Sequence, residues 1–134
     1  MPRQMLRVRV KTSHQNHMRF NMNSYESGLF AEFLAKWYLR FHGFRIVRSR
    51  YITGRNTGRA EIDIIARRRN LMIFVEVKRR PNVETAWSAI TPGQSVRLRR
   101  GAENFIAQTG WTGDTRFDAI LVCGLHIHWA RGAL

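Results

Sequence analysis

Cysteine, long apolar runs and acidic residues are scarce in this sequence, and each shortage excludes a class of structure. The 134-residue chain has one cysteine, Cys123, so neither an intrachain disulfide nor a cysteine-based zinc site can form. No run of about 18 apolar residues is present, so no membrane-spanning segment and no membrane association are expected. The first residues are basic and lack the apolar segment of a secretory signal, and we therefore expect a cytoplasmic protein.

Acidic residues are heavily outnumbered. The chain has 9 Asp and Glu against 23 Lys and Arg, which gives a net charge of +14. An excess of this size attracts polyanions such as nucleic acid, although a merely soluble cationic protein is the plainer alternative. All Lys and Arg residues except Lys11, Lys36 and Lys78 are arginine, whose planar guanidinium group binds phosphate. A lysine at position 78, inside a predicted strand, is therefore unusual for this chain and is a candidate for a specific role.

The spacing of apolar residues predicts a helix, three strands, a second helix and two further strands. Repeats at three and four residues predict helices over 25–42 and 94–108, with Trp37 in the core. Alternating or β-branched runs predict strands at 44–49, 61–66, 71–78, 117–123 and 126–129. This order favours an α/β or α+β fold, in which helices flank a mixed β-sheet of about five strands.

The remaining segments are predicted to be connections. Residues 1–23 are basic and polar and are expected to form an N-terminal arm before a single domain over 24–134. Residues 52–59 contain glycine and polar residues and are predicted to form a loop, and residues 67–70 are predicted to form a hairpin turn. Residues 82–89 are predicted to be a loop or a short helix.

Two neighbouring predicted strands carry charged residues in apolar surroundings. Because side chains alternate along a strand, Glu76 and Lys78 share one face of the strand 71–78. On the preceding strand, Asp63 is predicted to share a face with Glu61 and Ile65, while Ile62 and Ile64 share the opposite face. If the hairpin register brings Asp63 beside Glu76, two carboxylates and one ammonium group meet at one end of the sheet.

These residue types suit metal-assisted chemistry on a phosphodiester. Two neighbouring carboxylates repel, so the pKa of one rises unless a cation lies between them. Mg²⁺ and Mn²⁺ prefer oxygen ligands, and such an ion can activate a water molecule. Lys78 can then stabilise charge that develops on the phosphate. The alternative is a salt bridge between Glu76 and Lys78 on a solvated strand, with Asp63 at the strand edge.

Four segments carry a resemblance to a known family. Asp63, twelve residues and then Glu76-Val77-Lys78 resemble the PD-(D/E)xK motif of restriction-endonuclease-like folds, especially archaeal Holliday-junction resolvases. More closely, the chain resembles the YraN family of small bacterial proteins over roughly residues 24–130. The segments that match are AEFLAKWYLRFHG (31–43), AEIDIIA (60–66), FVEVKRR (74–80) and RFD (116–118).

The resemblance implies a metal-dependent nuclease that acts on DNA, with Mg²⁺ or Mn²⁺ as its cofactor. It implies that Glu32, on the first helix, joins Asp63 and Glu76 as a metal ligand, and that Lys78 completes the catalytic set. Resolvase-like relatives work as dimers, so a homodimer is expected by analogy. Two alternatives remain open: a non-catalytic nucleic-acid-binding protein on the same fold, and an RNA- or ribosome-associated factor.

Further residues are candidates for contact with nucleic acid. Arg79 and Arg80 directly follow Lys78 and are expected near the mouth of the cleft. Gln94 stands near the start of the second helix, where the resembling proteins carry lysine. The basic run 67–69 is either a solvated turn or a phosphate contact beside the site. The predicted nucleic-acid-binding residues are Arg59, Arg79, Arg80, Gln94 and Arg97.

Overall fold

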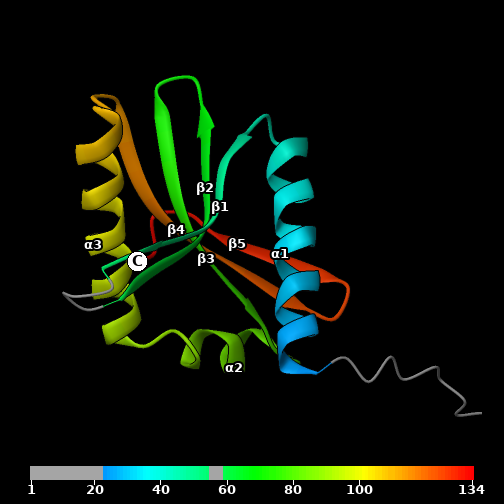
Figure 1. The fold of residues 1–134 in the computed structure, drawn as a ribbon. Helices are drawn as coiled ribbons and strands as arrows, with labels where there is room; N and C mark the ends of the chain where they lie inside the picture. Colours follow the sequence, from blue (N-terminus) through cyan, green and yellow to red (C-terminus); the bar gives the residue numbers. More distant parts are fainter. Residues whose placement is uncertain (1–22, 55–58) are drawn as a thin grey trace, which may run out of the picture.

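A five-stranded sheet lies between helices in the computed structural model of the chain, which describes residues 23–54 and 59–134 (Figure 1). The expected arm at 1–23 lies outside these residues except for residue 23. No helix within the described ranges is long and apolar enough to cross a membrane. The elements in chain order are α1 (Ser24–Phe41), β1 (Arg45–Thr53), β2 (Ala60–Arg68), β3 (Leu71–Arg79), α2 (Val83–Ser88), α3 (Pro92–Thr109), β4 (Asp114–Cys123) and β5 (His126–Ala130).

The strands lie in the order β1-β2-β3-β4-β5. Neighbouring strands are antiparallel except β3 and β4, which run parallel. A parallel pair needs a crossover of about a dozen or more residues, and the segment that contains α2 and α3 provides it here. The predicted α+β fold, with a mixed five-stranded sheet flanked by helices, is therefore confirmed.

The helices α1 and α3 cover opposite faces of the sheet (Figure 1). Along β3, Val75 and Val77 pack in the core cluster under α1, whereas Met72 and Phe74 pack in the cluster under α3. Such a strand is buried on both faces, which explains its nearly continuous apolar sequence. The short helix α2 contributes Ala86 to a third cluster, with residues of β4.

Short-range signals determine where the two long helices begin and end. The side chain of Asn23 caps α1 and accepts a hydrogen bond from the backbone amide of Glu26. A capping box of Thr91 and Gln94 opens α3, so this helix starts two residues earlier than predicted. It is followed by Gly110 in the left-handed conformation, at φ 69°, where glycine has no steric penalty.

The strands β1 and β2 are longer than predicted. Ile52 and Thr53, predicted to lie in a loop, continue β1 and pair with Glu61 and Ala60 of β2. Arg67, predicted to lie in the hairpin turn, pairs with strand β3. Backbone hydrogen bonds to a neighbouring strand hold these residues in the sheet, and such bonds do not depend on the polarity of the side chain.

Candidate functional site

Asp63 lies at the point where β2 separates from β3. The two strands are paired between Ile64↔Val75 and the hairpin turn, and Asp63 lies beyond the end of that ladder. The backbone amide of Val77 has no β2 carbonyl to bond, and it donates instead to Oδ2 of Asp63 at 2.8 Å. The Asp63 side chain thus replaces a backbone acceptor, and this bond holds its carboxylate against β3.

The alternation of side chains along β2 is interrupted at the same place. Ile64 packs in the cluster under α1, while Ile62 and Ile65 both pack in the cluster under α3. The prediction that Ile62 and Ile64 share a face is therefore wrong. On the adjacent strand, Arg50 has a φ of 52°, which few residues other than glycine adopt. The interrupted alternation at Asp63 is thus accompanied by an irregular backbone in β1.

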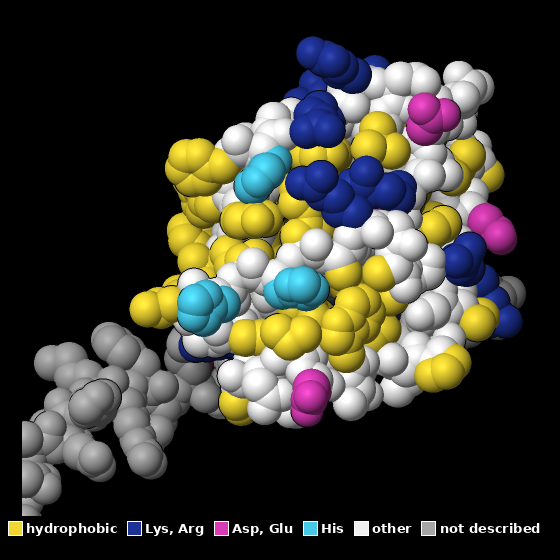
Figure 2. Space-filling model, turned by 180° about the vertical axis from the view of Figure 1, so that it is seen from behind, with side chains coloured by type: hydrophobic (Ala, Val, Ile, Leu, Met, Phe, Trp, Pro, Cys, Tyr) yellow, Lys and Arg dark blue, Asp and Glu magenta, His cyan; other side chains and the backbone are white. Residues whose placement is uncertain are grey.

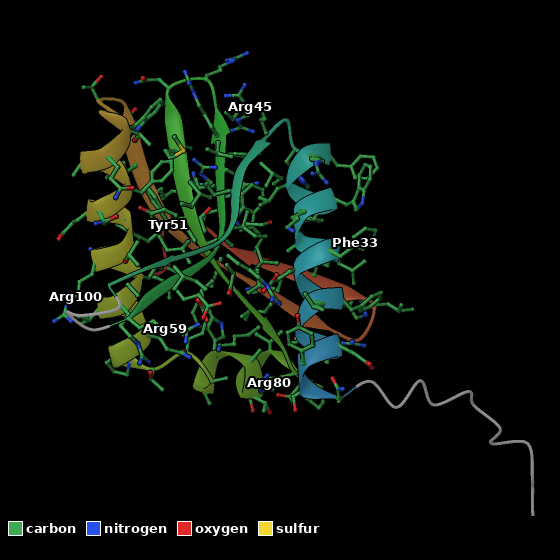
Figure 3. The ribbon with its side chains drawn as sticks, viewed as in Figure 1. Phe33, Arg45, Tyr51, Arg59, Arg80 and Arg100 are labelled. Carbon is green, nitrogen blue, oxygen red and sulfur yellow. The ribbon has the colours of Figure 1, made fainter. Side chains whose placement is uncertain are left out.

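The separation of the strands opens a cavity of about 570 Å³. Figure 3 shows Arg59 and Arg80 toward one end of the sheet and Arg45 at the other. Three of the five predicted nucleic-acid-binding residues and all four predicted catalytic residues line the cavity: Arg59, Gln94, Arg97, Glu32, Asp63, Glu76 and Lys78. The tertiary structure therefore brings together residues that are far apart in the sequence.

Two carboxylates and one lysine form the centre of this cavity. The side chain of Glu76 is 12% exposed, and its Oε1 lies 3.2 Å from Nζ of Lys78. Burial, and then the negative charge of Glu76, raises the pKa of Asp63 to about 8. Burial also raises the pKa of Glu76, although Lys78 opposes this shift. Without a cation, burial and the neighbouring charge of Glu76 therefore favour the protonated form of the Asp63 carboxyl group.

Glu32 reaches the same cavity from α1 but has a different partner. Its Oε2 lies 3.1 Å from Nε of Arg50, in a salt bridge between the helix and β1. Across the ranges 23–54 and 59–134, no three Asp, Glu, His or Cys side chains lie close enough together to hold a metal ion. The structure thus joins Asp63 with Glu76 and holds Glu32 on the cavity wall.

The donors in the cavity fit a hard divalent cation bound by two carboxylates. Mg²⁺ usually keeps several water molecules and binds one or two protein carboxylates, which matches Asp63 and Glu76. A cation beside this pair would relieve the burial and repulsion that raise the pKa of Asp63. Glu32 would have to leave Arg50 to become a third ligand.

Two of the predicted nucleic-acid-binding residues lie outside the cavity lining. The guanidinium group of Arg79 lies 4.8 Å from the ring centre of Phe30, and its Nη1 lies 3.4 Å from Oγ of Ser27. Arg80 donates from its Nη1 to the carbonyl oxygen of Arg79. Gln94 does line the cavity, but its Oε1 accepts the backbone amide at the start of α3 at 3.2 Å.

The basic run 67–69 is not part of this site. Arg67, Arg68 and Arg69 line a separate hollow together with Gly43 and Arg45, near the hairpin turn between β2 and β3. This hollow shares no lining residue with the cavity that contains Asp63. Of the two interpretations of the basic run, a phosphate contact beside the candidate site does not agree with this position.

Four residues of the site were not identified from the sequence. Glu61, Gly28 and Val77 line the cavity. Glu61 had a signal, because it lies two residues from Asp63 on the same predicted strand. Arg50 had no such signal in the sequence, because its salt bridge with Glu32 joins a helix to a strand 18 residues away.

Fold and site together define a basic α+β protein with a recessed pair of carboxylates and a lysine. Residues 31–122 match the family described as Uncharacterised protein family UPF0102, and the chain belongs to this family. It is 41% identical over 101 residues to the UPF0102 protein of Bradyrhizobium diazoefficiens, covering 74% of this chain and 73% of that protein. It is 39% identical over 97 residues to the UPF0102 protein of Paramagnetospirillum magneticum, covering 71% and 75%.

The family match bears directly on the cavity. The matched residues 31–122 begin one residue before Glu32 and include Asp63, Glu76 and Lys78. The expected membership in a family of small bacterial proteins is therefore confirmed.

Proposed function

We propose that this protein is a metal-dependent nuclease-like protein that binds DNA and hydrolyses phosphodiester bonds. The observation that carries the proposal is the pair Asp63 and Glu76 beside Lys78 in a cavity of a chain with net charge +14. Groups with a strongly raised pKa in a cleft are candidates for function. The placement of Asp63 and of Glu76-Val77-Lys78 on neighbouring strands supports membership of the PD-(D/E)xK superfamily.

Each residue of the site has a task in this proposal. Asp63 and Glu76 would hold a Mg²⁺ or Mn²⁺ ion, with Glu32 as the third acid on the wall. When bound, the ion supplies Lewis acidity at the phosphate and lowers the pKa of a coordinated water molecule. The ammonium group of Lys78, held by Glu76 at 3.2 Å, donates hydrogen bonds to a phosphate oxygen as negative charge develops there.

The basic residues of the cavity supply the contact with the substrate. Arg59 and Arg97 line the cavity together with the acids, and neither forms a salt bridge within the described part of the chain. Their guanidinium groups can therefore bind phosphates on either side of the reacting one. Binding through such contacts releases counterions and weakens steeply with added salt.

Cleavage of labelled branched and linear DNA in the presence of Mg²⁺ or Mn²⁺ tests the proposal. We expect cleavage by the wild-type protein and a loss of at least about 100-fold in Asp63→Ala and in Lys78→Ala, because each removes a group that acts at the phosphate. The matched controls Glu103→Ala and Lys36→Ala remove the same charges outside the cavity lining and should cleave normally. Equal cleavage by all variants would contradict the assignment of the site.

A non-catalytic nucleic-acid-binding protein is the second candidate. It is favoured by the two salt bridges of the cavity, Arg50–Glu32 and Lys78–Glu76, which compensate two of the acids without any metal. Tight DNA binding by the wild type and all variants, with no cleavage by any of them, would support this candidate. Retention on RNA but not on DNA at moderate salt would instead indicate an RNA- or ribosome-associated factor.

A further inference from the structure

Large apolar side chains recur at every fourth position on the exposed side of α1, as a ridge that winds slowly around the helix. Tyr25, Leu29, Phe33, Trp37 and Phe41, here called the α1 stripe, recur every four residues and are 65%, 38%, 55%, 48% and 84% exposed. Phe33 points away from the sheet in Figure 3, and hydrophobic side chains gather along the edge of the molecule that α1 forms in Figure 2. The expectation that Trp37 packs in the core is therefore wrong.

The α1 stripe is not needed to hold α1 on the sheet. The buried face of the helix consists of Ala31, Glu32, Ala35 and Leu39, which lie on the opposite side. Single exposed apolar residues are common, but contiguous patches of several hundred Å² mark interaction sites. An aromatic side chain has roughly 150–250 Å² of surface. Four partly exposed aromatic residues and a leucine therefore present a patch of several hundred Å².

We propose that the α1 stripe is the interface of a homodimer in which the α1 helices of two copies cross in antiparallel orientation about Phe33. Residues spaced by four form one of the ridges of a helix, and two such ridges interdigitate at a crossing angle of about −50°. A two-fold interface must be self-complementary. The α1 stripe meets this condition, because Leu29 and Trp37 are equally far from Phe33, and so are Tyr25 and Phe41.

The charges beside the α1 stripe fit the same arrangement. Two copies of a chain with net charge +14 repel each other, so their contact requires a surface with few uncompensated basic groups. The two exposed charged residues of α1 are Glu26 and Arg40, each seven residues from Phe33. The antiparallel crossing therefore brings Glu26 of one protomer toward Arg40 of the partner subunit at both ends of the interface.

The area of the patch also agrees with a second copy as the occupant. A stable interface of standard size buries about 800 Å² on each partner, and the α1 stripe with the adjoining Phe30, 39% exposed, supplies a large part of this area. A nucleic acid would instead require a row of basic residues along the helix. The dimer does not depend on the proposed nuclease activity, although α1 also carries Glu32 into the cavity.

Sedimentation velocity of the full chain over a range of concentrations tests the proposal. We expect a species of twice the 15.7 kDa mass of one chain. Phe33→Glu and Trp37→Glu should each weaken association at least about 100-fold, because each residue occurs twice at the centre of the interface. Both side chains are exposed, so the variants should keep the circular dichroism spectrum and melting temperature of a folded monomer.

A matched control separates the α1 stripe from general surface hydrophobicity. Leu125→Glu replaces a fully exposed apolar residue in the turn between β4 and β5 and should leave association unchanged. A wild-type chain that is monomeric at every concentration would overturn the proposal. So would a dimer that persists unchanged in both Phe33→Glu and Trp37→Glu.

Charge reversal tests the antiparallel register. Glu26→Arg and Arg40→Glu should each weaken association by up to about fivefold, because each places like charges opposite one another at both ends. The double variant Glu26→Arg with Arg40→Glu should restore wild-type association. A double variant that associates more weakly than either single variant would overturn the antiparallel arrangement about Phe33.

Discussion

Asp118 and the pair Asp63 with Glu76 are buried acids in the same sheet, but their surroundings differ. Asp118 in β4 is fully buried, and donors surround its carboxylate. Arg116 donates to both of its oxygens at 2.8 Å, and Nε1 of Trp129 and the amide of Gly132 donate at 2.9 and 2.8 Å. A buried charge that is completely paired in this way has a structural role.

Asp63 and Glu76 have fewer donors for two carboxylates. Within the described part of the chain, the backbone amide of Val77 bonds Asp63, and Lys78 forms the salt bridge with Glu76. The two acids also repel each other, and this contributes to the raised pKa of Asp63. Burial alone therefore does not distinguish a structural acid from a functional one, whereas the number of donors around the acid does.

The largest expected effect on stability comes from removing the carboxylate of Asp118, which is surrounded by donors. Asp118→Ala should lower the free energy of unfolding by about 3–5 kcal/mol, because Arg116 and the indole of Trp129 lose their buried acceptor. Urea denaturation measures this change. The control Asp114→Ala removes an exposed acid from the same strand and should change stability by less than about 0.5 kcal/mol. Equal effects of the two substitutions would contradict the structural role of Asp118.

Substitution of Asp63, which has fewer donors, should change the free energy of unfolding in the opposite direction. Because the pKa of Asp63 rises from 3.8 to about 8 on folding, the metal-free folded protein binds a proton that the unfolded chain releases. The stability that this proton contributes is present at low pH and is lost as pH rises from about 4 to about 8. Asp63→Asn should remove this loss and make the metal-free protein more stable than wild type at pH 8.

Urea denaturation with a chelator at pH 5 and pH 8 measures the difference between Asp63→Asn and wild type. The stabilisation by Asp63→Asn should be larger at pH 8 than at pH 5. Added Mn²⁺ at pH 8 should stabilise the wild type, by about 1.4 kcal/mol at tenfold excess over its dissociation constant, and should leave the variant unchanged. A variant less stable than wild type at pH 8 would show that the Asp63 carboxylate is not under strain in the metal-free protein.

The smallest expected effect concerns Glu32, the third acid on the cavity wall. Arg50→Gln removes the salt bridge and frees Glu32 to turn toward Asp63 and Glu76. We expect Mn²⁺ affinity, measured by titration calorimetry, to rise by up to about fivefold, in keeping with the modest strength of partly exposed salt bridges. Arg48→Gln, on the same strand, is the matched control and should not change it. Unchanged affinity in Arg50→Gln would exclude Glu32 as a ligand.

Much of this site could be predicted because its residues lie on strands with a regular period. Alternation along β3 holds in the structure, where Phe74 packs in the cluster under α3 and Val75 in the cluster under α1. The interrupted alternation at Asp63 could not be predicted in this way. It depends on the end of the β2–β3 ladder, on the bond from the Val77 amide and on a positive φ at Arg50, which the local pattern does not encode.

The exposure of the outer face of α1 could not be predicted from local spacing either. The three- and four-residue spacing predicted the helix, but the apolar residues lie on more than one side of it, so the spacing could not tell Leu39 in the core from Phe41 at the surface. The sequence by itself determined the order of the elements, the family and the candidate acids, because these follow from local periodicity and residue type. Only the tertiary structure decided that β2 leaves β3 at Asp63 and that the α1 stripe is exposed, because both depend on which elements meet.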